Sequence, residues 1–169
     1  MKSVKTQDSP VILNWVGPIG YRNNEIVPHK IDPAAPNRDH IEKVSQENGV
    51  YCIVGDHLIY GPRSLLYIGR TKTTFAKRLY EHRDWLNEEW RVEIYFAEVK
   101  PTDLWEPVEK LLIYSHSPSY NSQNIDALNL EEPLTIWNTG RYWGLLPEIS
   151  SVHPWYKQAK KRIKTTQDK

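Results

Sequence analysis

The sequence predicts an α+β domain with a small three-stranded antiparallel sheet flanked by helices. Three stretches rich in β-forming residues lie at 49–55, 65–69 and 92–99, and helical patterns follow the second and third of them. The chain has 169 residues, of which 39% are hydrophobic and 25% charged, and this composition is ordinary for one globular domain.

The first two strands are expected to form a hairpin. The connection between 49–55 and 65–69 carries Gly61-Pro62 as a turn signal and is too short for a crossover helix, so the strands should pair antiparallel. The only cysteine of the sequence, Cys52, lies in the first strand. We expect it to be a small buried hydrophobe rather than a catalytic thiol.

Residues 71–86 predict one helix, because apolar side chains recur along it at helical spacing. Arg78 and His82 are four residues apart, which places them on one face of that helix. The segment 92–99 then predicts the third strand.

A second helix is expected from about residue 104 to residue 115. Pro107 fits only in its first turn, and the helix must end before Pro118, which leaves Asn121 in the following loop. Glu109 lies at the edge of the buried face of this helix, and Glu106 lies about one turn earlier.

The rest of the chain is expected to extend this core, which spans residues 49–122. Residues 1–48 are rich in turn formers, so they predict an irregular N-terminal extension, with a short strand at 11–15 and a helical turn at 39–45 as its regular parts. Residues 123–169 predict a C-terminal extension that packs on the core and ends in a basic tail.

Charge and composition narrow the function classes only partly. With 22 basic and 21 acidic residues, the net charge of +1 does not indicate a nucleic-acid binder, so any such function must rest on local basic clusters. One cysteine cannot form an internal disulfide or a thiolate zinc cluster. No apolar run approaches the roughly 20 residues of a membrane helix, and no signal-peptide pattern is visible. We therefore expect a cytoplasmic protein without a membrane partner.

Two tripeptides and the polar residues behind them resemble the GIY-YIG nuclease superfamily. The tripeptides are Gly49-Val50-Tyr51 and Tyr67-Ile68-Gly69, and they are followed in order by Arg78, His82, Glu109 and Asn121. The resemblance covers about residues 49–122. It implies a three-stranded antiparallel sheet with flanking helices, and an endonuclease that hydrolyses phosphodiester bonds with one Mg²⁺, for which Mn²⁺ can substitute.

The resemblance also implies a role for each of these residues. Tyr51 would act as the general base or orient the attacking water, with support from His82. Tyr67 would form a hydrogen bond near the scissile phosphate, and Arg78 would stabilise its growing charge. Glu109 would hold the metal.

Three further residues complete the expected site. Asn121 would brace it, as the resemblance implies. Arg70 and Lys72 directly follow the second strand, where they either contact phosphates or are solvated loop charges.

These residue types suit metal-dependent hydrolysis. Magnesium keeps several waters and accepts a phosphate oxygen, so a single carboxylate is enough to anchor it. The guanidinium of Arg78 offers a fork of donors that matches two phosphate oxygens. A tyrosine has an unperturbed pKa near 10, so as a base it needs help from nearby cations or a metal.

Two questions stay open at this level. The same fold could serve as a catalytically inactive nucleic-acid-binding or protein-interaction module, although such a module would be expected to lack one of the polar residues. The expected DNA substrate is either duplex or branched, and a restriction-type enzyme would be expected to act as a homodimer. An enzyme for nucleotides is less favoured, because neither a phosphate-binding loop nor a dinucleotide fingerprint is present.

Overall fold

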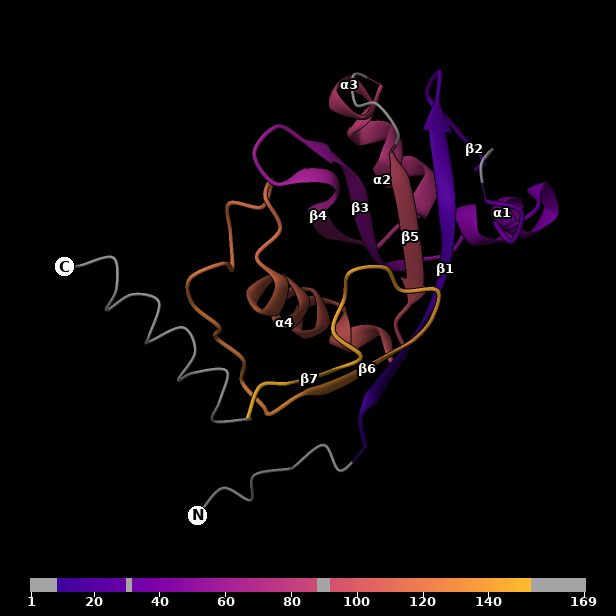
Figure 1. The fold of residues 1–169 in the computed structure, drawn as a ribbon. Helices are drawn as coiled ribbons and strands as arrows, with labels where there is room; N and C mark the ends of the chain where they lie inside the picture. The colour runs from indigo at the N-terminus through magenta and orange to yellow at the C-terminus, as the bar shows by residue number, and fades with distance from the viewer. Residues whose placement is uncertain (1–8, 30–31, 88–91, 153–169) are drawn as a thin grey trace, which may run out of the picture.

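The computed structural model describes residues 9–29, 32–87 and 92–152 (Figure 1). Seven strands form one mixed sheet in the order β4-β3-β5-β1-β6-β7, and β2 also pairs with β1. The strands are β1 (Val11–Arg22), β2 (Glu25–Pro28), β3 (Gly49–His57), β4 (Gly61–Thr71), β5 (Glu93–Glu98), β6 (Thr135–Gly140) and β7 (Glu148–Ser150). The helices are α1 (Arg38–Ser45), α2 (Phe75–Glu81), α3 (Arg83–Leu86), the 3-10 helix η1 (Thr102–Leu104) and α4 (Trp105–His116).

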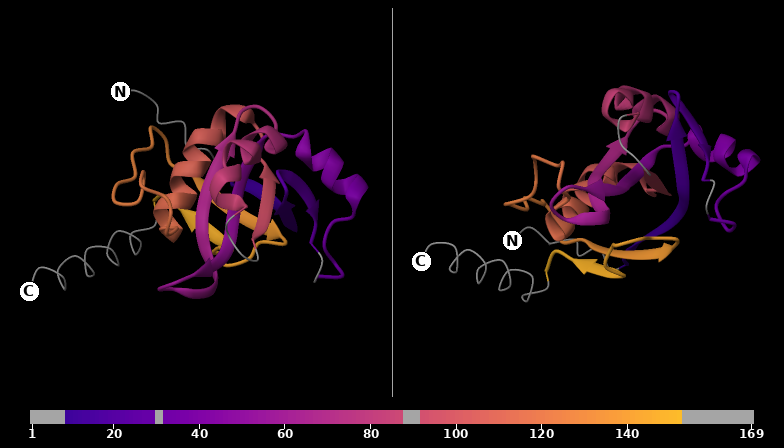
Figure 2. Two further views of the ribbon diagram at one scale, coloured as in Figure 1. Left: turned by 90° about the horizontal axis from the view of Figure 1, so that it is seen from above. Right: turned by 45° about the horizontal axis from the view of Figure 1, so that its top comes forward.

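The prediction of a small three-stranded sheet is wrong. Strands β4, β3 and β5 pair antiparallel, as expected for the hairpin and the third strand, but they form only one side of a larger sheet. On the other side, β1 pairs antiparallel with β5 and parallel with β6. The sheet curls into a half-barrel as the long β1 passes from one part to the other (Figure 2).

The N-terminal segment is more regular than expected, since it holds β1, β2 and α1, and β1 continues seven residues beyond the short strand expected at 11–15. Gly17, Pro18 and Gly20 lie inside the strand rather than in a loop. A Cβ on Gly17 would lie 2.5 Å from Tyr95 Cδ1, so a glycine is needed where β1 meets this ring. The first half of β1 alternates between buried and exposed residues, which is the pattern of a strand with one face in the core.

Both faces of the sheet carry a hydrophobic core. Successive residues of β3 point to opposite faces, so Val50 and Cys52 pack with α4, while Tyr51 and Ile53 pack with α1 and α2. In Figure 1, α4 and α1 lie on opposite sides of β5 and β1. Cys52 is fully buried, as expected, and burial raises the pKa of its thiol.

The expected continuous helix over 71–86 is divided in two. Helix α2 begins after Thr74, whose Oγ1 accepts a hydrogen bond from the backbone N–H of Lys77. It ends at Glu81, and His82, with φ −96° and ψ 4°, links α2 to α3. His82 therefore follows the helix that carries Arg78 instead of sharing it.

The second predicted helix is confirmed as α4. Pro107 lies in its first turn, and Ser117, in the left-handed conformation at φ 48°, closes its C-terminal end. No helix in the described ranges is long and apolar enough to cross a membrane. The basic tail predicted for the C-terminal end lies outside the described residues.

Candidate active site at the edge of strand β4

Tyr51 lies at the centre of a polar cluster on the face of the sheet that α2 covers. Its hydroxyl oxygen is 2.9 Å from Nε2 of His82 and accepts a hydrogen bond from Nε of Arg78 at 3.2 Å. The hydroxyl can donate its proton to Nε2 when His82 is neutral and carries its own proton on Nδ1. Burial and the adjacent Arg78 lower the pKa of His82, which favours this neutral form.

Tyr51 itself is fully buried, with no exposed surface. Burial and the neighbouring Tyr67 raise the pKa of Tyr51, and the opposing effect of Arg78 is too small to compensate. Tyr51 is therefore a neutral phenol at ordinary pH. It holds Arg78 and His82 in place, and both of these side chains are partly exposed.

Gly69 allows the two tyrosines of the tripeptides to approach each other. A Cβ at this position would lie 2.5 Å from the hydroxyl oxygen of Tyr51 and 2.7 Å from Cε1 of Tyr67. The ring centroids of the two tyrosines are 6.0 Å apart, and the ring of Tyr67 lies 5.2 Å from that of His82. The glycine of the second tripeptide is thus required by close packing.

Arg78 lies at the solvent-exposed side of this cluster. Its Nη1 is 2.5 Å from Oε2 of Glu81, one turn along α2. Glu81 is exposed, so this ion pair adds little to stability and is easily exchanged for another anion. The guanidinium is therefore positioned by Tyr51 and remains able to bind a phosphate.

Glu109 projects from α4, which covers the face of the sheet opposite to Tyr51 and α2. Nε of Arg70 donates a hydrogen bond to its Oε2 at 2.7 Å, and no described residue bonds to its Oε1. Burial raises the pKa of Glu109, while Arg70 and Arg78 oppose the rise. The carboxylate is thus held in one orientation with one oxygen available.

Glu106 is the other candidate for a metal ligand on this helix. Its side chain is 48% exposed, against 16% for Glu109. Its carboxylate lies 2.7 Å from Nζ of Lys110 and 3.4 Å from Nη2 of Arg70. Both oxygens of the solvated Glu106 are paired, whereas Glu109 is paired through Oε2, so Glu109 is the better candidate.

Arg70 and Lys72 differ from each other in their surroundings. Arg70, which was expected either to contact phosphates or to be a solvated loop charge, is a partly buried partner of Glu109. Lys72 is exposed, and its charge helps to lower the pKa of Glu106, so it lies near the start of α4. Of the two, only Lys72 presents a solvated cation beside the site.

Asn121 braces the outer edge of β4. Its Oδ1 accepts a hydrogen bond from the N–H of Ile68, and its Nδ2 donates to the carbonyl of Ile68, both at 2.9 Å. Ile68 lies between Tyr67 and Gly69, so the amide of Asn121 fixes the backbone that carries the second tripeptide. Just before it, the N–H of Tyr120 donates to the carbonyl of Leu66 at 2.8 Å.

The predicted residues thus form two groups that meet at the edge of β4. Tyr51, Tyr67, Arg78 and His82 lie on the α2 side, and Glu109 lies on the α4 side. The two groups are joined through β4, because Gly69 lies against Tyr51 and Tyr67, and the next residue, Arg70, donates to Glu109.

Two aromatic residues next to this cluster were missed in the sequence. The ring of Trp85 lies 5.8 Å from that of His82 and 6.2 Å from that of Tyr67, and the ring of Tyr120 lies 5.7 Å from that of Trp85. Their positions, three residues after His82 and one before Asn121, were the only signal available. Nothing in the local pattern brings 85 and 120 together, because they belong to different parts of the chain.

The donors at the edge of β4 fit magnesium better than zinc. In the parts of the chain that the structure describes, no three His, Cys, Asp or Glu side chains gather as a zinc site would require. A magnesium ion keeps several waters and needs few protein ligands. One carboxylate with an available oxygen, such as Glu109, is compatible with that requirement.

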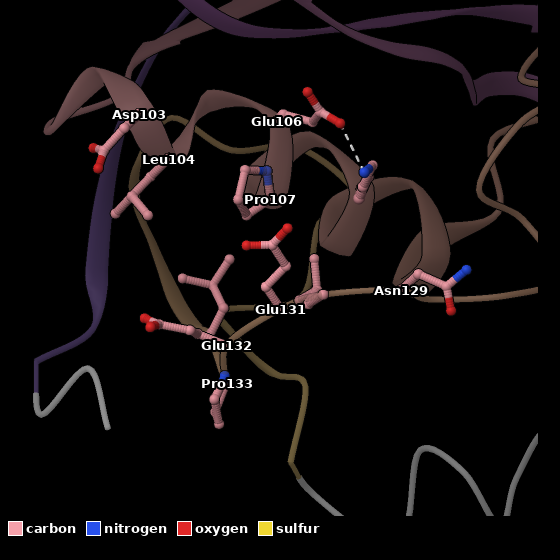
Figure 3. A pocket seen from close by; sticks show the side chains of 11 residues that line it. Asp103, Leu104, Glu106, Pro107, Asn129, Glu131, Glu132 and Pro133 are labelled. Atoms are coloured by element: carbon pink, nitrogen blue, oxygen red, sulfur yellow. Dashed lines mark ion pairs between the residues drawn. The ribbon is translucent and has the colours of Figure 1, made fainter. Parts of the chain in front are cut away.

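A separate cavity of about 350 Å³ lies at the start of α4 (Figure 3). Carboxylates dominate its charged lining, and Glu131 extends toward Pro107 while Glu106 pairs with Lys110. A lining of this charge repels a phosphate backbone. We therefore do not assign this cavity to the candidate site.

Comparison with known proteins adds nothing to this assignment. No family model, no curated protein and no solved structure matches the chain. The resemblance to the GIY-YIG nucleases is therefore limited to the residues and motifs named above.

Proposed function

We propose that this chain is a metal-dependent endonuclease of GIY-YIG type that hydrolyses phosphodiester bonds in DNA. The observation that carries this proposal is that β4 joins two polar groups: Tyr51, Arg78 and His82 beside Gly69, and Glu109 bonded to the next residue, Arg70. These residues come from β3, from α2 and its end, and from α4, so their proximity is a product of the fold rather than of the sequence.

The proposed proton path starts at the Tyr51 hydroxyl. In this proposal the exposed Glu81 gives up Arg78 to a phosphate, and the accompanying shift of the guanidinium would open the buried Tyr51 oxygen to a water. As a water attacks phosphorus, its proton passes to this oxygen, and the proton of Tyr51 moves to Nε2 of neutral His82. The water oxygen forms the new bond to phosphorus while the bond to the leaving oxygen breaks.

Groups on both faces of the sheet would stabilise the negative charge that develops on the phosphate in the transition state. Arg78 provides paired donors to the phosphate oxygens, which are worth most where charge develops. Glu109 would hold the magnesium ion, with Arg70 fixing the orientation of the carboxylate. A bound magnesium supplies Lewis-acid stabilisation of the phosphate and of the leaving oxygen. The exposed Lys72 and Lys77 offer contacts to neighbouring phosphates.

A cleavage panel tests this proposal. The chain is incubated with plasmid, single-stranded and branched DNA in the presence of Mg²⁺ or Mn²⁺, with EDTA as the negative control. We expect cleavage of at least one substrate, and a reduction of about 10²–10³-fold for Arg78→Ala, because one charge-stabilising donor is lost. Arg38→Ala, an exposed arginine on α1, serves as the matched control and should cleave normally.

The alternative is a catalytically inactive nucleic-acid-binding or protein-interaction module. One observation favours it: Arg78 and Glu109 both have ion-pair partners in the protein. Absence of cleavage of every DNA in the panel would support this alternative over the endonuclease.

A further inference from the structure

A row of aromatic rings leads away from the candidate site. It begins at Trp85, beside His82 and Tyr67, and continues to Tyr120 at 5.7 Å. From Tyr120 it reaches His57, again with 5.7 Å between the ring centroids.

The row ends at the tip of the β3–β4 hairpin. His57 stacks on Tyr60 with ring centroids 4.7 Å apart. Leu58 and Ile59, between them, have relative exposures of 105% and 83%, and together with Tyr60 they are the most exposed large hydrophobic residues of the described chain. Figure 1 shows this hairpin projecting from the sheet, with the chain after α4 rising toward it.

The tip is an ordered turn rather than a loose loop. Nδ1 of His57 accepts hydrogen bonds from the N–H groups of Ile59 and Tyr60, at 3.1 and 3.2 Å. The conformation that exposes Leu58 and Ile59 is therefore fixed by the protein. Apolar side chains held in water in this way indicate a surface that binds a partner.

We propose that this row binds unpaired bases beside the cleaved phosphate, and that the hairpin tip inserts at the end of the adjoining duplex. The preferred substrate is then DNA with a junction between paired and unpaired strands. This inference rests on the proposed function, because the row begins at the proposed site. Aromatic side chains stack on bases whatever their sequence, and apolar wedges at a turn separate base steps.

Two observations favour a nucleic acid over a protein partner. The row is continuous with the rings of His82 and Tyr67, so a strand lying along it has a phosphate at Arg78. The exposed part is also narrow, since three residues at one turn offer far less than the roughly 800 Å² that each side of a stable protein interface buries.

Binding without a metal separates this inference from catalysis. Fluorescence anisotropy in EDTA gives the dissociation constants for a blunt duplex, a splayed-arm duplex of the same sequence, and the splayed-arm duplex with abasic nucleotides next to the junction. We expect the splayed-arm duplex to bind at least about tenfold more tightly than the other two, because base stacking on an aromatic residue is of this size.

Substitutions then locate the contact. Tyr60→Ala and the double variant Leu58→Ser/Ile59→Ser should each lose most of this preference, while their affinity for the blunt duplex changes less than twofold. All three residues are exposed, so the fold should survive, and circular dichroism checks that it does. The matched controls are Trp137→Ala and Ile12→Ser, which change exposed apolar residues on β6 and β1 and should retain the preference.

Other outcomes would overturn the inference. Equal affinity for the three DNAs, or an equal loss of affinity for all of them in Tyr60→Ala, would show that the row does not read unpaired bases. A wild-type dimer in light scattering that Leu58→Ser/Ile59→Ser dissociates, with DNA binding unchanged, would assign the tip to self-association. A chain that cuts no DNA yet shows the preference and loses it in the variants would leave this inference standing and refute the proposed function alone.

Discussion

At the scale of single residues, the Tyr51 hydroxyl connects the two groups that the proposed chemistry needs most. It accepts from Arg78 and lies within hydrogen-bond distance of Nε2 of His82, so one buried phenol positions both the guanidinium and the imidazole. Burial raises the pKa of Tyr51 and lowers that of His82, and both shifts favour the neutral forms of these side chains. In the proposed mechanism, His82 is therefore the proton acceptor of the pair.

We predict that cleavage falls in acid with a pKa below 6.5, the ordinary value for histidine. Protonated His82 cannot accept the proton of Tyr51, and its pKa in the folded chain is lowered by burial and by Arg78. Single-turnover rates with Mg²⁺ between pH 5 and 8 give the profile. His82→Gln should lose about 10²-fold or more at pH 7.5 and should lack this acid limb.

A pH profile that is the same in His82→Gln and in the unchanged chain would contradict this role.

The lowered pKa of His82 also affects the stability of the fold. Because the pKa of His82 is lower in the folded than in the unfolded chain, its contribution to stability is complete above pH 6.5 and is lost as the pH falls through the folded-state pKa. His116, whose pKa is likewise lowered by burial, acts in the same direction.

At the scale of elements, the outer edge of β4 depends on the loop after α4. The side chain of Asn121 takes the place of a neighbouring strand by bonding both polar groups of Ile68. Tyr120 extends this pairing to Leu66. The loop thereby covers an otherwise open sheet edge and fixes the strand that carries Tyr67 and Gly69.

We predict that Asn121→Ala lowers the free energy of unfolding by about 1–3 kcal/mol, the usual cost of leaving a buried polar group without its partner. Urea unfolding at pH 7.5 measures the change. Asn129→Ala, an exposed asparagine later in the same segment, should stay within about 0.5 kcal/mol of the unchanged chain. Equal effects of the two substitutions would show that the bonds to Ile68 do not brace the strand.

Local patterns predicted the elements wherever one rule dominated. The β3–β4 hairpin and α4 follow from β-forming runs and from the positions of Pro107 and Pro118. The second half of β1 was missed because Gly17 and Pro18 normally mark turns, and only the contact with Tyr95 explains the glycine. The end of α2 at Glu81 also had no local signal.

In the candidate site, too, local patterns predicted which residues to consider but not the contacts between them. The motifs identified the residues, but the pairing of Arg70 with Glu109 joins β4 to α4 across the fold and has no trace in either segment. The aromatic row likewise combines residues from the hairpin, α3 and the loop after α4. Contacts between distant segments depend on the tertiary structure, so local patterns in a single sequence do not predict them.

At the scale of the whole molecule, β1 joins the two parts of the sheet. It lies between β5 and β6, and its buried residues enter both cores, Leu13 and Trp15 on the α4 face and Ile19 on the α2 face. The N-terminal segment is thus a central part of the fold that positions the site.

We predict that a fragment of residues 49–122 does not fold by itself. Without β1, strand β5 has an unpaired edge, and both cores lose large buried side chains. Circular dichroism should show little regular structure and no cooperative thermal transition, whereas residues 9–152 should show both. A cooperative transition in the short fragment would mean that β1 and β6 are additions to an independent core.

The most direct test of the central claim is the metal-dependent cleavage rate of Glu109→Gln compared with that of Glu106→Gln. Both substitutions remove one carboxylate from neighbouring turns of α4, but only Glu109 is placed to hold the metal. We predict that Glu109→Gln loses at least about a thousandfold in rate, because a metal contributes several kcal/mol to the transition state. Glu106→Gln should remain within a few-fold of the unchanged chain. Normal cleavage by Glu109→Gln, or an equal loss in both variants, would contradict the account.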